Sequence, residues 1–430
     1  MPRTRRFFLP LLSSLLALAL APAVAADWPQ WRGPALDGSS EETGLPLTWS
    51  ATENVLWRLA MPARSAATPI VWGDRIFLNI SYDPDKDGRL ELWCVSRSEG
   101  KVLWKRPLGQ GNELKYKQHM STPSPVTDGK RVWVMTGTGV IKAFDFDGKE
   151  LWARDLQKEY GTFGLQWGYA SSPLLFEGAL IVQVLNGMHT DDPSYLLSID
   201  GGTGKTRWRT ERPTKAIRES PDAYSTPMLL RREGRAEVVV SGGDVLTGHD
   251  AVNGKELWRV GNLNPGNSPA GRLVASPLVS GRRIFAFGKR GPIQAFEAPE
   301  GSGAPPKLLW NYDKGTDVPT PVTDGTYLYV INDRAVAWCF EAATGRIVWG
   351  PERMPSGTYS ASPVLADGRI YVTNEEGTTA VLEAGPKFNL LAENALGSYT
   401  LSSPAIADGK IYLRTSDYLY AIGRGNADSH

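Results

Sequence analysis

Cysteine and histidine are scarce in this chain, and the motifs that depend on them are missing. The 430 residues contain two cysteines and four histidines. No Cys-x-x-Cys or His-x-x-His spacing occurs, so the sequence gives no basis for a zinc site or a covalently attached haem. A Gly-x-Ser-x-Gly nucleophile elbow and a phosphate-binding loop are missing too, which excludes the common hydrolase and nucleotide-binding signatures.

The chain also has almost no net charge. Its 47 lysines and arginines nearly balance 46 aspartates and glutamates, for a formal charge of +1. No basic run is long enough to attract nucleic acid or anionic lipid. We therefore predict neither a nucleic-acid partner nor binding to a membrane surface.

The most apolar stretch lies at the start of the chain. Residues 1–25 carry three arginines before an apolar run over residues 7–20, and Ala23-Val24-Ala25 offers a small-x-small cleavage site. This pattern predicts a cleavable signal peptide, and residues 4–9 also resemble the twin-arginine export motif. The signal peptide predicts a periplasmic or secreted protein. Because no Cys follows the cleavage site, we expect no lipid anchor, and the apolar run is too short to favour a membrane anchor.

An internal repeat runs through the rest of the sequence. Eight times a Ser or Thr beside a Pro leads into an apolar strand, and successive prolines are 56, 48, 54, 50, 44, 42 and 41 residues apart. These starts are Thr68-Pro69, Ser124-Pro125, Ser172-Pro173, Thr226-Pro227, Ser276-Pro277, Thr320-Pro321, Ser362-Pro363 and Ser403-Pro404. The spacing is typical of one four-stranded propeller blade per repeat. We predict an all-β, eight-bladed propeller.

The eighth repeat is one strand short. After Ser403 the sequence offers strands around 403–407, 411–415 and 418–422 and then stops. Residues 54–58 carry the pattern of a fourth strand with no blade before them, so pairing them with the last repeat would close the ring and cover exposed strand edges. The predicted organisation is a signal peptide (1–25), an N-terminal extension (26–53), one propeller (54–424) and a tail (425–430).

Tryptophans recur where the fourth strand of each blade is expected to end. They are Trp57, Trp104, Trp152, Trp208, Trp258, Trp310 and Trp349. In three repeats the Trp follows a small-x-acid-x-x-Thr/Asn-Gly turn, as in Ser198, Asp200, Thr203-Gly204 and Trp208. An indole there can bury a large area against the neighbouring blade, and the Gly supplies a positive φ in the turn. We assign these residues a structural role.

This pattern resembles the repeat of the quinoprotein-like (PQQ-repeat) propellers, which include quinoprotein alcohol dehydrogenases and the BamB outer-membrane assembly lipoprotein. The entry segment Trp28-Pro29-Gln30-Trp31-Arg32-Gly33-Pro34, with Asp37-Gly38, is similar to the leader of secreted bacterial PQQ-binding-like repeat proteins. The resemblance implies the propeller fold and two functions. One is a non-catalytic binding or scaffold module, and the other is a PQQ- and calcium-dependent dehydrogenase of an alcohol or sugar.

The sequence favours the non-catalytic function. The dehydrogenases of the family often carry adjacent cysteines, whereas Cys94 and Cys339 are far apart and occupy the same small position of two different repeats. We therefore expect two buried free thiols rather than a disulfide. The calcium ligands of the dehydrogenases cannot be matched to residues of this chain, and no metal site is predicted. We expect a monomer that binds a small ligand or an envelope protein.

The long connections before blades 2 to 5 are where a binding site is expected. They lie on one face of the ring, opposite the tight Asp-Gly and Thr-Gly turns, and loops held by a rigid scaffold often carry binding residues. The candidate ligand-binding residues on these loops and hairpins are His119, Trp167, Tyr169, Glu219, Tyr224, Asp244, Arg272, Lys289 and Arg290. Aromatic rings with cations and a carboxylate around a channel mouth suit a planar, anionic or polyhydroxylated ligand. The alternative is that the aromatics only pack over the channel while the charges stay solvated at the rim.

Overall fold

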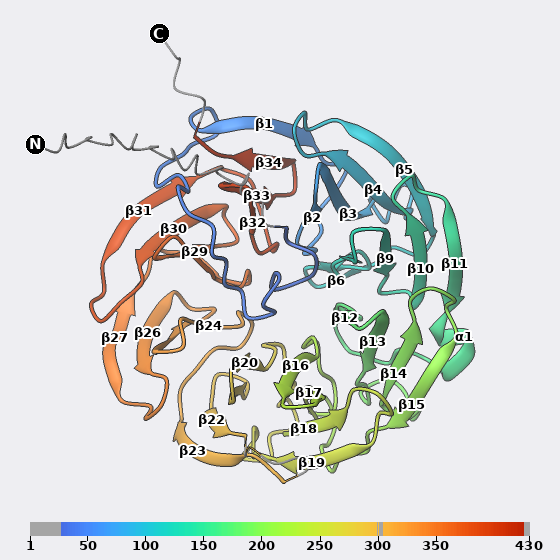
Figure 1. Cartoon of the computed structure of the whole chain (residues 1–430), viewed down its shortest axis with the longest axis vertical. Helices are drawn as coiled ribbons and strands as arrows, with labels where there is room; N and C mark the ends of the chain where they lie inside the picture. Colours follow the sequence, from blue (N-terminus) through green and yellow to red (C-terminus); the bar gives the residue numbers. More distant parts are fainter. Residues whose placement is uncertain (1–26, 299, 301–303, 425–430) are drawn as a thin grey trace, which may run out of the picture.

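The computed structural model describes residues 27–298, 300 and 304–424, and it shows eight four-stranded antiparallel sheets arranged around a central axis (Figure 1). The predicted signal peptide and tail lie outside these residues. Among the described residues the largest helix, α1 (Leu156–Tyr160), has five residues, and none is long and apolar enough to cross a membrane. The prediction of an all-β, eight-bladed propeller is confirmed.

Each blade except blade 4 runs from a short inner strand to a longer outer strand, and in blade 4 both strands have five residues. Blades 1 and 2 consist of β2 (Ile70–Trp72), β3 (Arg75–Ser81), β4 (Leu90–Ser96) and β5 (Val102–Gly109), then β8 (Val126–Thr127), β9 (Arg131–Met135), β10 (Val140–Asp145) and β11 (Glu150–Asp155). Blades 3 and 4 consist of β12 (Leu174–Phe176), β13 (Ala179–Val184), β14 (Tyr195–Asp200) and β15 (Thr206–Glu211), then β16 (Met228–Arg232), β17 (Arg235–Gly242), β18 (Val245–Asp250) and β19 (Glu256–Val260). Blades 5 and 6 consist of β20 (Leu278–Ser280), β21 (Arg283–Phe287), β22 (Ile293–Glu297) and β23 (Lys307–Tyr312), then β24 (Val322–Thr323), β25 (Tyr327–Ile331), β26 (Val336–Glu341) and β27 (Ile347–Arg353). Blade 7 consists of β28 (Val364–Ala366), β29 (Arg369–Thr373), β30 (Thr378–Glu383) and β31 (Leu390–Ala395).

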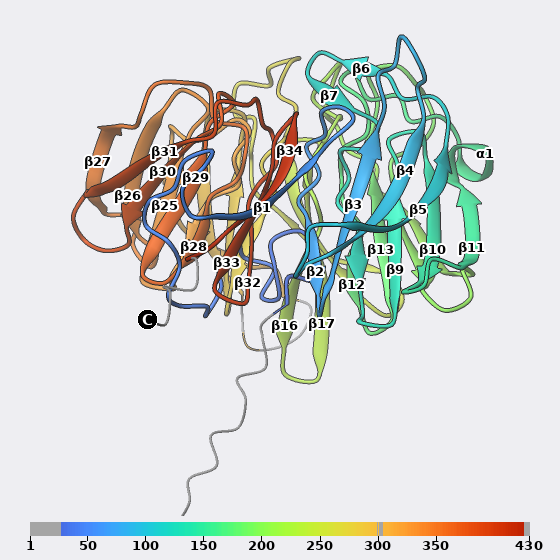
Figure 2. The same cartoon turned by 90° about the horizontal axis from the view of Figure 1, so that it is seen from above.

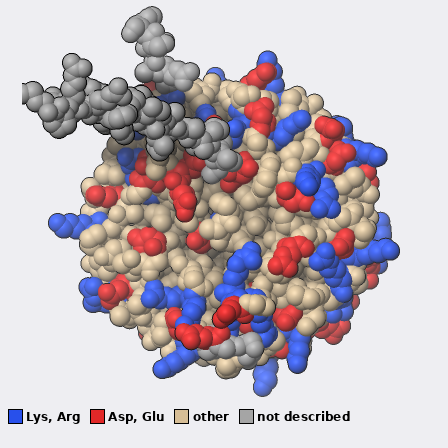
Figure 3. Space-filling model, viewed as in Figure 1, with Lys and Arg blue, Asp and Glu red and all other residues tan. Residues whose placement is uncertain are grey.

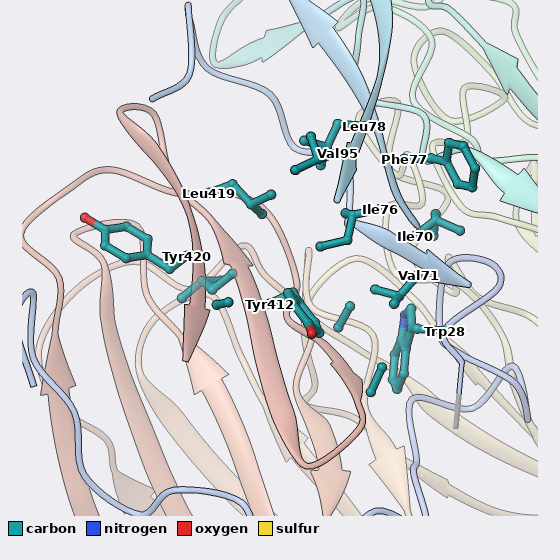
Figure 4. Packing of buried hydrophobic residues seen from close by; sticks show 14 of the residues in the cluster. Trp28, Ile70, Val71, Ile76, Phe77, Leu78, Val95, Tyr412, Leu419 and Tyr420 are labelled. Atoms are coloured by element: carbon teal, nitrogen blue, oxygen red, sulfur yellow. The ribbon is translucent and has the colours of Figure 1, made fainter. Parts of the chain in front are cut away.

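The last blade joins the two ends of the propeller. Its strands β32 (Ala405–Ala407), β33 (Lys410–Arg414) and β34 (Tyr418–Ile422) are completed by β1 (Val55–Ala60), which pairs with β34 in antiparallel register. Figure 4 shows the apolar side chains that gather where this closing blade meets blade 1. Trp28, Val71 and Tyr412 are among them, and all three are buried. The predicted closure by the N-terminal strand is confirmed.

Six of the seven recurrent tryptophans hydrogen-bond to the next blade, whereas Trp258 bonds to Glu237 of its own blade. The Trp57 indole donates to Arg97 O at 2.9 Å, and a Cβ on Gly100 would lie 2.4 Å from its ring, so the positive-φ glycine lets the turn rest on the indole. Trp152 and Gly204 repeat this contact. One detail differs from the prediction. The Trp lies inside its strand rather than at its end, because the outer strand continues for several residues beyond it.

Two hairpins mark the opposite faces of the ring. The small hairpin β6 (Leu114–Lys115) and β7 (Gln118–His119) lies at one face, and the β16–β17 hairpin projects from the other (Figure 2). Figure 3 shows acidic and basic side chains interspersed over the face that is viewed in Figure 1. No large patch of one sign is visible there, in keeping with the balanced composition.

Candidate ligand-binding site

The central channel is closed at one end by the N-terminal segment. Residues 28–40, here called the plug, cross the middle of the ring (Figure 1) and pair with the free edges of the inner strands. Trp28 and Val71 exchange two backbone hydrogen bonds of 2.9 Å, Thr127 N donates to Pro29 O, and Leu175 N donates to the Gln30 side chain. Blades 1, 2 and 3 are therefore bridged at equivalent positions, three residues after the Ser/Thr of each repeat.

Arg32 holds the plug against the far side of the ring. Its guanidinium donates to Pro363 O at 2.7 Å, to Pro321 O at 2.9 Å and to Asp37 O at 2.8 Å. The side chain is buried, and this burial lowers the pKa of Arg32 to about 10. A Cβ on Gly38 would lie 2.1 Å from the guanidinium, so the Asp37-Gly38 turn leaves room for it. The entry motif of the sequence thus forms a structural seal.

The Ser or Thr of each repeat start joins neighbouring blades around the axis. The backbone N–H of Ser124 donates to Ser172 Oγ at 2.9 Å, and the same bond links seven successive pairs of blades. The acceptors, here called the hydroxyl ring, are Ser124, Ser172, Thr226, Ser276, Thr320, Ser362 and Ser403. All seven are buried, and their hydroxyl hydrogens have no acceptor among the described residues. These hydrogens therefore remain able to donate into the channel.

Above the plug the channel forms a cavity of about 460 Å³ that is open at the other end. Trp31 of the plug and the hydroxyl ring line its deep part. A second tier consists of the residues two positions earlier in each repeat, because alternate residues of an extended segment face the same side. This tier contains Ala66, Thr122, Ala170, Tyr224, Val274, Val318, Ser360 and Leu401. The cavity is thus polar at its base and largely apolar at half depth.

The mouth brings together residues that are far apart in the sequence. Trp167 donates through its indole N–H to Glu219 at 2.7 Å, and its backbone N–H donates to the Tyr224 hydroxyl at 3.1 Å. Arg272 lies 3.3 Å from the same Glu219 carboxylate. Of these four residues, Trp167, Tyr224 and Arg272 line the cavity, and Glu219 supports them from behind. The predicted convergence of these side chains at the mouth is present in the structure.

Asp317 is the most unusual residue of the cavity wall. It is 5% exposed, and its Oδ1 atom has no hydrogen-bond partner among the described residues. Its Oδ2 lies 3.9 Å from Arg272 and 3.8 Å from Arg290, too far for hydrogen bonds. Burial raises the pKa of Asp317 although Arg272, Lys289 and Arg290 oppose this shift. The neighbouring Asp333 accepts the Asp317 backbone N–H at 3.3 Å and also lines the cavity.

The β6–β7 hairpin spans the mouth. Lys117 at its tip forms an ion pair with Glu375 and donates to Ser360 at 2.9 Å, both on the far side of the channel. Tyr116 beside it is 76% exposed, and its ring lies 5.6 Å from that of Trp167. Lys115, Tyr116 and Lys117 all line the cavity, so a ligand that enters must pass this hairpin.

Besides Glu219, four of the nine predicted site residues do not line this cavity. His119 is buried beside Asn112, and desolvation together with nearby arginines lowers its pKa to about 4. Tyr169 is buried and donates to Gln183 O, because its neighbour Ala170 takes the position that faces the channel. Asp244 accepts from Ser220 and lines a separate groove. Lys289 donates to Ala270 O at 2.8 Å. The predicted convergence of His119 and Tyr169 at the mouth is therefore wrong. Lys289, which the sequence places at the mouth or its rim, lies close enough to Arg272 and Asp317 for their charges to act on it.

Sequence reasoning missed several lining residues. In the sequence Trp31 is recognisable only as part of the entry motif, and the hydroxyl ring only as the marker of each repeat start. Their contacts across the channel axis leave no periodic pattern in the sequence. Asp317 follows the outer strand of blade 5, and Asp333 follows the second strand of blade 6, where the connections are short. Lys117 escaped notice although it lies two residues before His119. A lysine at a hairpin tip is the one signal that could have drawn attention to it.

The donor set of the cavity does not fit a calcium-bound quinone. Calcium prefers about six to eight oxygen ligands, with carboxylates among them. Across the part of the chain that the structure describes, no three His, Cys, Asp or Glu side chains gather in a metal-binding arrangement. Asp317 and Asp333 are the carboxylates that line the cavity, and Asp317 already faces two guanidinium groups. We therefore derive no chemical step through such a cofactor.

Comparison with known proteins identifies relatives of the fold. A model of the family described as outer membrane protein assembly factor BamB matches residues 86–350, which is 265 of the 430 residues. The crystal structure of BamB from Moraxella catarrhalis is similar at 13% identity with a TM-score of 0.61, over 87% of this chain and 99% of that one. The quinohemoprotein alcohol dehydrogenase from Comamonas testosteroni is similar at 12% identity with a TM-score of 0.65, over 94% of this chain and 82% of that one. No curated protein sequence matches the chain.

Proposed function

The chain belongs to the family described as outer membrane protein assembly factor BamB, and from this premise we propose that it is an exported binding or scaffold module without catalytic activity of its own. The observation that carries the proposal is the one-ended cavity. Its base is sealed by Trp31 and Arg32, and its mouth is formed by the long connections around Trp167. A ligand or a protein loop is bound at this mouth, and the rest of the ring acts as the scaffold.

The compartment and assembly state are part of the same proposal. Residues 1–25 have the pattern of a signal peptide, so the mature protein functions in the periplasm or after secretion. It functions as a monomer and docks a small ligand or an envelope protein on the face that carries the β6–β7 hairpin. The name of the matching family, an outer membrane protein assembly factor, is consistent with a role in the cell envelope. The likeness to the BamB structure, at 13% identity, supports the fold alone.

A PQQ- and calcium-dependent dehydrogenase is the alternative function. The likeness to quinohemoprotein alcohol dehydrogenases and the cationic mouth favour it. The arginines beside Asp317 weigh against it, because their positive charges oppose a calcium ion at this carboxylate. No sequence feature supplies a haem to carry the electrons onward.

One experiment separates the two functions. The purified protein is incubated with PQQ and calcium, and alcohol- or sugar-dependent dye reduction is measured. We expect none, and substrate-dependent reduction would establish the dehydrogenase instead. In parallel, phthalate, citrate and glucuronate are tested for stabilisation of the wild-type protein and of a Trp167→Ala, Arg272→Ala double variant. Stabilisation of the wild type that the double variant loses supports a binding module at this mouth. Equal stabilisation of both proteins places binding elsewhere.

A further inference from the structure

Asp317 offers an unsatisfied acceptor to a ligand that donates a hydrogen bond. A buried carboxylate oxygen normally has a partner, and Asp317 Oδ1 has none among the described residues. The nearby arginines do not donate to Oδ1, since both face the other oxygen, Oδ2, at distances beyond hydrogen bonding. Asp317 lines the cavity, and because its Oδ1 atom is itself buried, a rotation of the carboxylate presents this oxygen to a hydroxyl group of a bound molecule.

Arg290 beside it provides the complementary group. Its side chain is 54% exposed, and its ion pair with Asp317 is a long one, at 3.8 Å. The guanidinium lines the mouth and carries a planar fork of donors, which matches a carboxylate in two-point contact. A donor fork and an unpaired acceptor thus lie side by side at the same point of the wall.

The remaining lining suits several hydroxyl groups on one compact molecule. The hydroxyl ring offers hydrogens at the base, and each of its oxygens keeps one lone pair after accepting a backbone N–H. At the mouth, Tyr116 and Trp167 present aromatic surface against which the apolar face of a ring can pack. The cavity of about 460 Å³ has room for a molecule of the size of one or two sugar rings.

We propose that the cavity binds a small polyhydroxylated carboxylic acid of the sugar-acid class, with its carboxylate on Arg290 and one hydroxyl donating to Asp317 Oδ1. This inference rests on the proposed function and names its ligand class. A neutral sugar leaves Arg290 without an anion, and an acid without hydroxyl groups leaves Asp317 without a donor. Both are therefore bound more weakly than a molecule that carries the two groups together.

Isothermal titration calorimetry at low salt tests this with three probes of similar size: D-glucuronate, D-glucose and cyclohexanecarboxylate. The wild-type protein is expected to bind glucuronate at least about ten-fold more tightly than either of the others, since a charge-assisted hydrogen bond contributes about one order of magnitude or more in affinity. Arg290→Gln should weaken both acids. Asp317→Ala should remove the preference for glucuronate over cyclohexanecarboxylate.

Arg346 provides the matched control, because it is exposed, pairs with Glu341 and does not line the cavity. Arg346→Gln should bind glucuronate like the wild type, and melting curves confirm that each variant is folded. If the wild type binds glucuronate no more tightly than cyclohexanecarboxylate or glucose, or binds none of the three, the inference is wrong. Binding of the acids without a preference for hydroxyl groups would leave the binding module intact, whereas dye reduction with PQQ and calcium would overturn the proposed function itself.

Discussion

Replacing Arg32 by methionine should loosen the plug without dismantling the propeller. The change removes three hydrogen bonds of 2.7–2.9 Å while keeping a long apolar side chain in the same space. Each charge-assisted bond contributes about 1.5–3 kcal/mol. Against this stands the desolvation of the guanidinium, whose pKa falls from 12.5 to about 10, equivalent to about 3 kcal/mol. The net cost of the substitution is about 1.5–6 kcal/mol, with about 3 kcal/mol inside this range, and it acts on the seal rather than on the blades.

Hydrogen exchange measured by mass spectrometry reads out this local loss. Val71 N donates to Trp28 O and Thr127 N to Pro29 O, so opening of the plug exposes both amides. A loss of about 3 kcal/mol corresponds to exchange roughly a hundred-fold faster at these sites. The exposed Arg346 serves as the control, because Arg346→Met should leave both amides unchanged. Exchange within about three-fold of the wild type in Arg32→Met would show that the guanidinium does not hold the plug.

Three further predictions concern the ring and its buried groups. A chain that starts at residue 61 lacks β1 and should lose cooperative unfolding, whereas one that starts at residue 53 keeps β1 and should stay closed; similar melting curves for both would contradict the closure. Cys94 and Cys339 are buried free thiols whose pKa values rise to about 11 and about 12, so a maleimide should label two thiols rapidly after unfolding and neither in the native protein. Burial lowers the pKa values of His119 and His249 to about 4, so stability should be full above pH 6.5 and fall by at least about 2 kcal/mol towards pH 4. His249→Gln should flatten this pH dependence in urea titrations, and an unchanged slope would exclude the residue as its source.

The fold could be predicted because its cause is repeated along the sequence. Each Ser/Thr beside a Pro marks an inner strand, and each Trp marks an outer strand that packs on the next blade. The closure followed from the same regularity, since the eighth repeat lacked a strand that residues 55–60 supply.

The candidate site was harder to predict because it depends on which side of a strand a residue faces. Tyr224 lies two residues before Thr226 and faces the channel, whereas Tyr169 lies three residues before Ser172 and points into the blade. Sequence proximity to a repeat start does not distinguish the two cases. Arg32 is a second residue whose role could not be predicted. Its partners Pro321 and Pro363 are about three hundred residues away, and no local sequence pattern indicates these contacts.

The pairing of β1 with β34 also sets the order in which the molecule can be assembled. Val55 and Ile422 lie side by side, although nearly the whole chain separates them. Blades 1 to 7 are each built from one continuous stretch and can form as soon as that stretch has been synthesised. Blade 8 has to wait for the last strand, and until then β1 remains an unpaired edge that another chain could capture. The ring can therefore close only in a chain that has been synthesised as far as β34. A chain that stops before β34 leaves β1 without its neighbour.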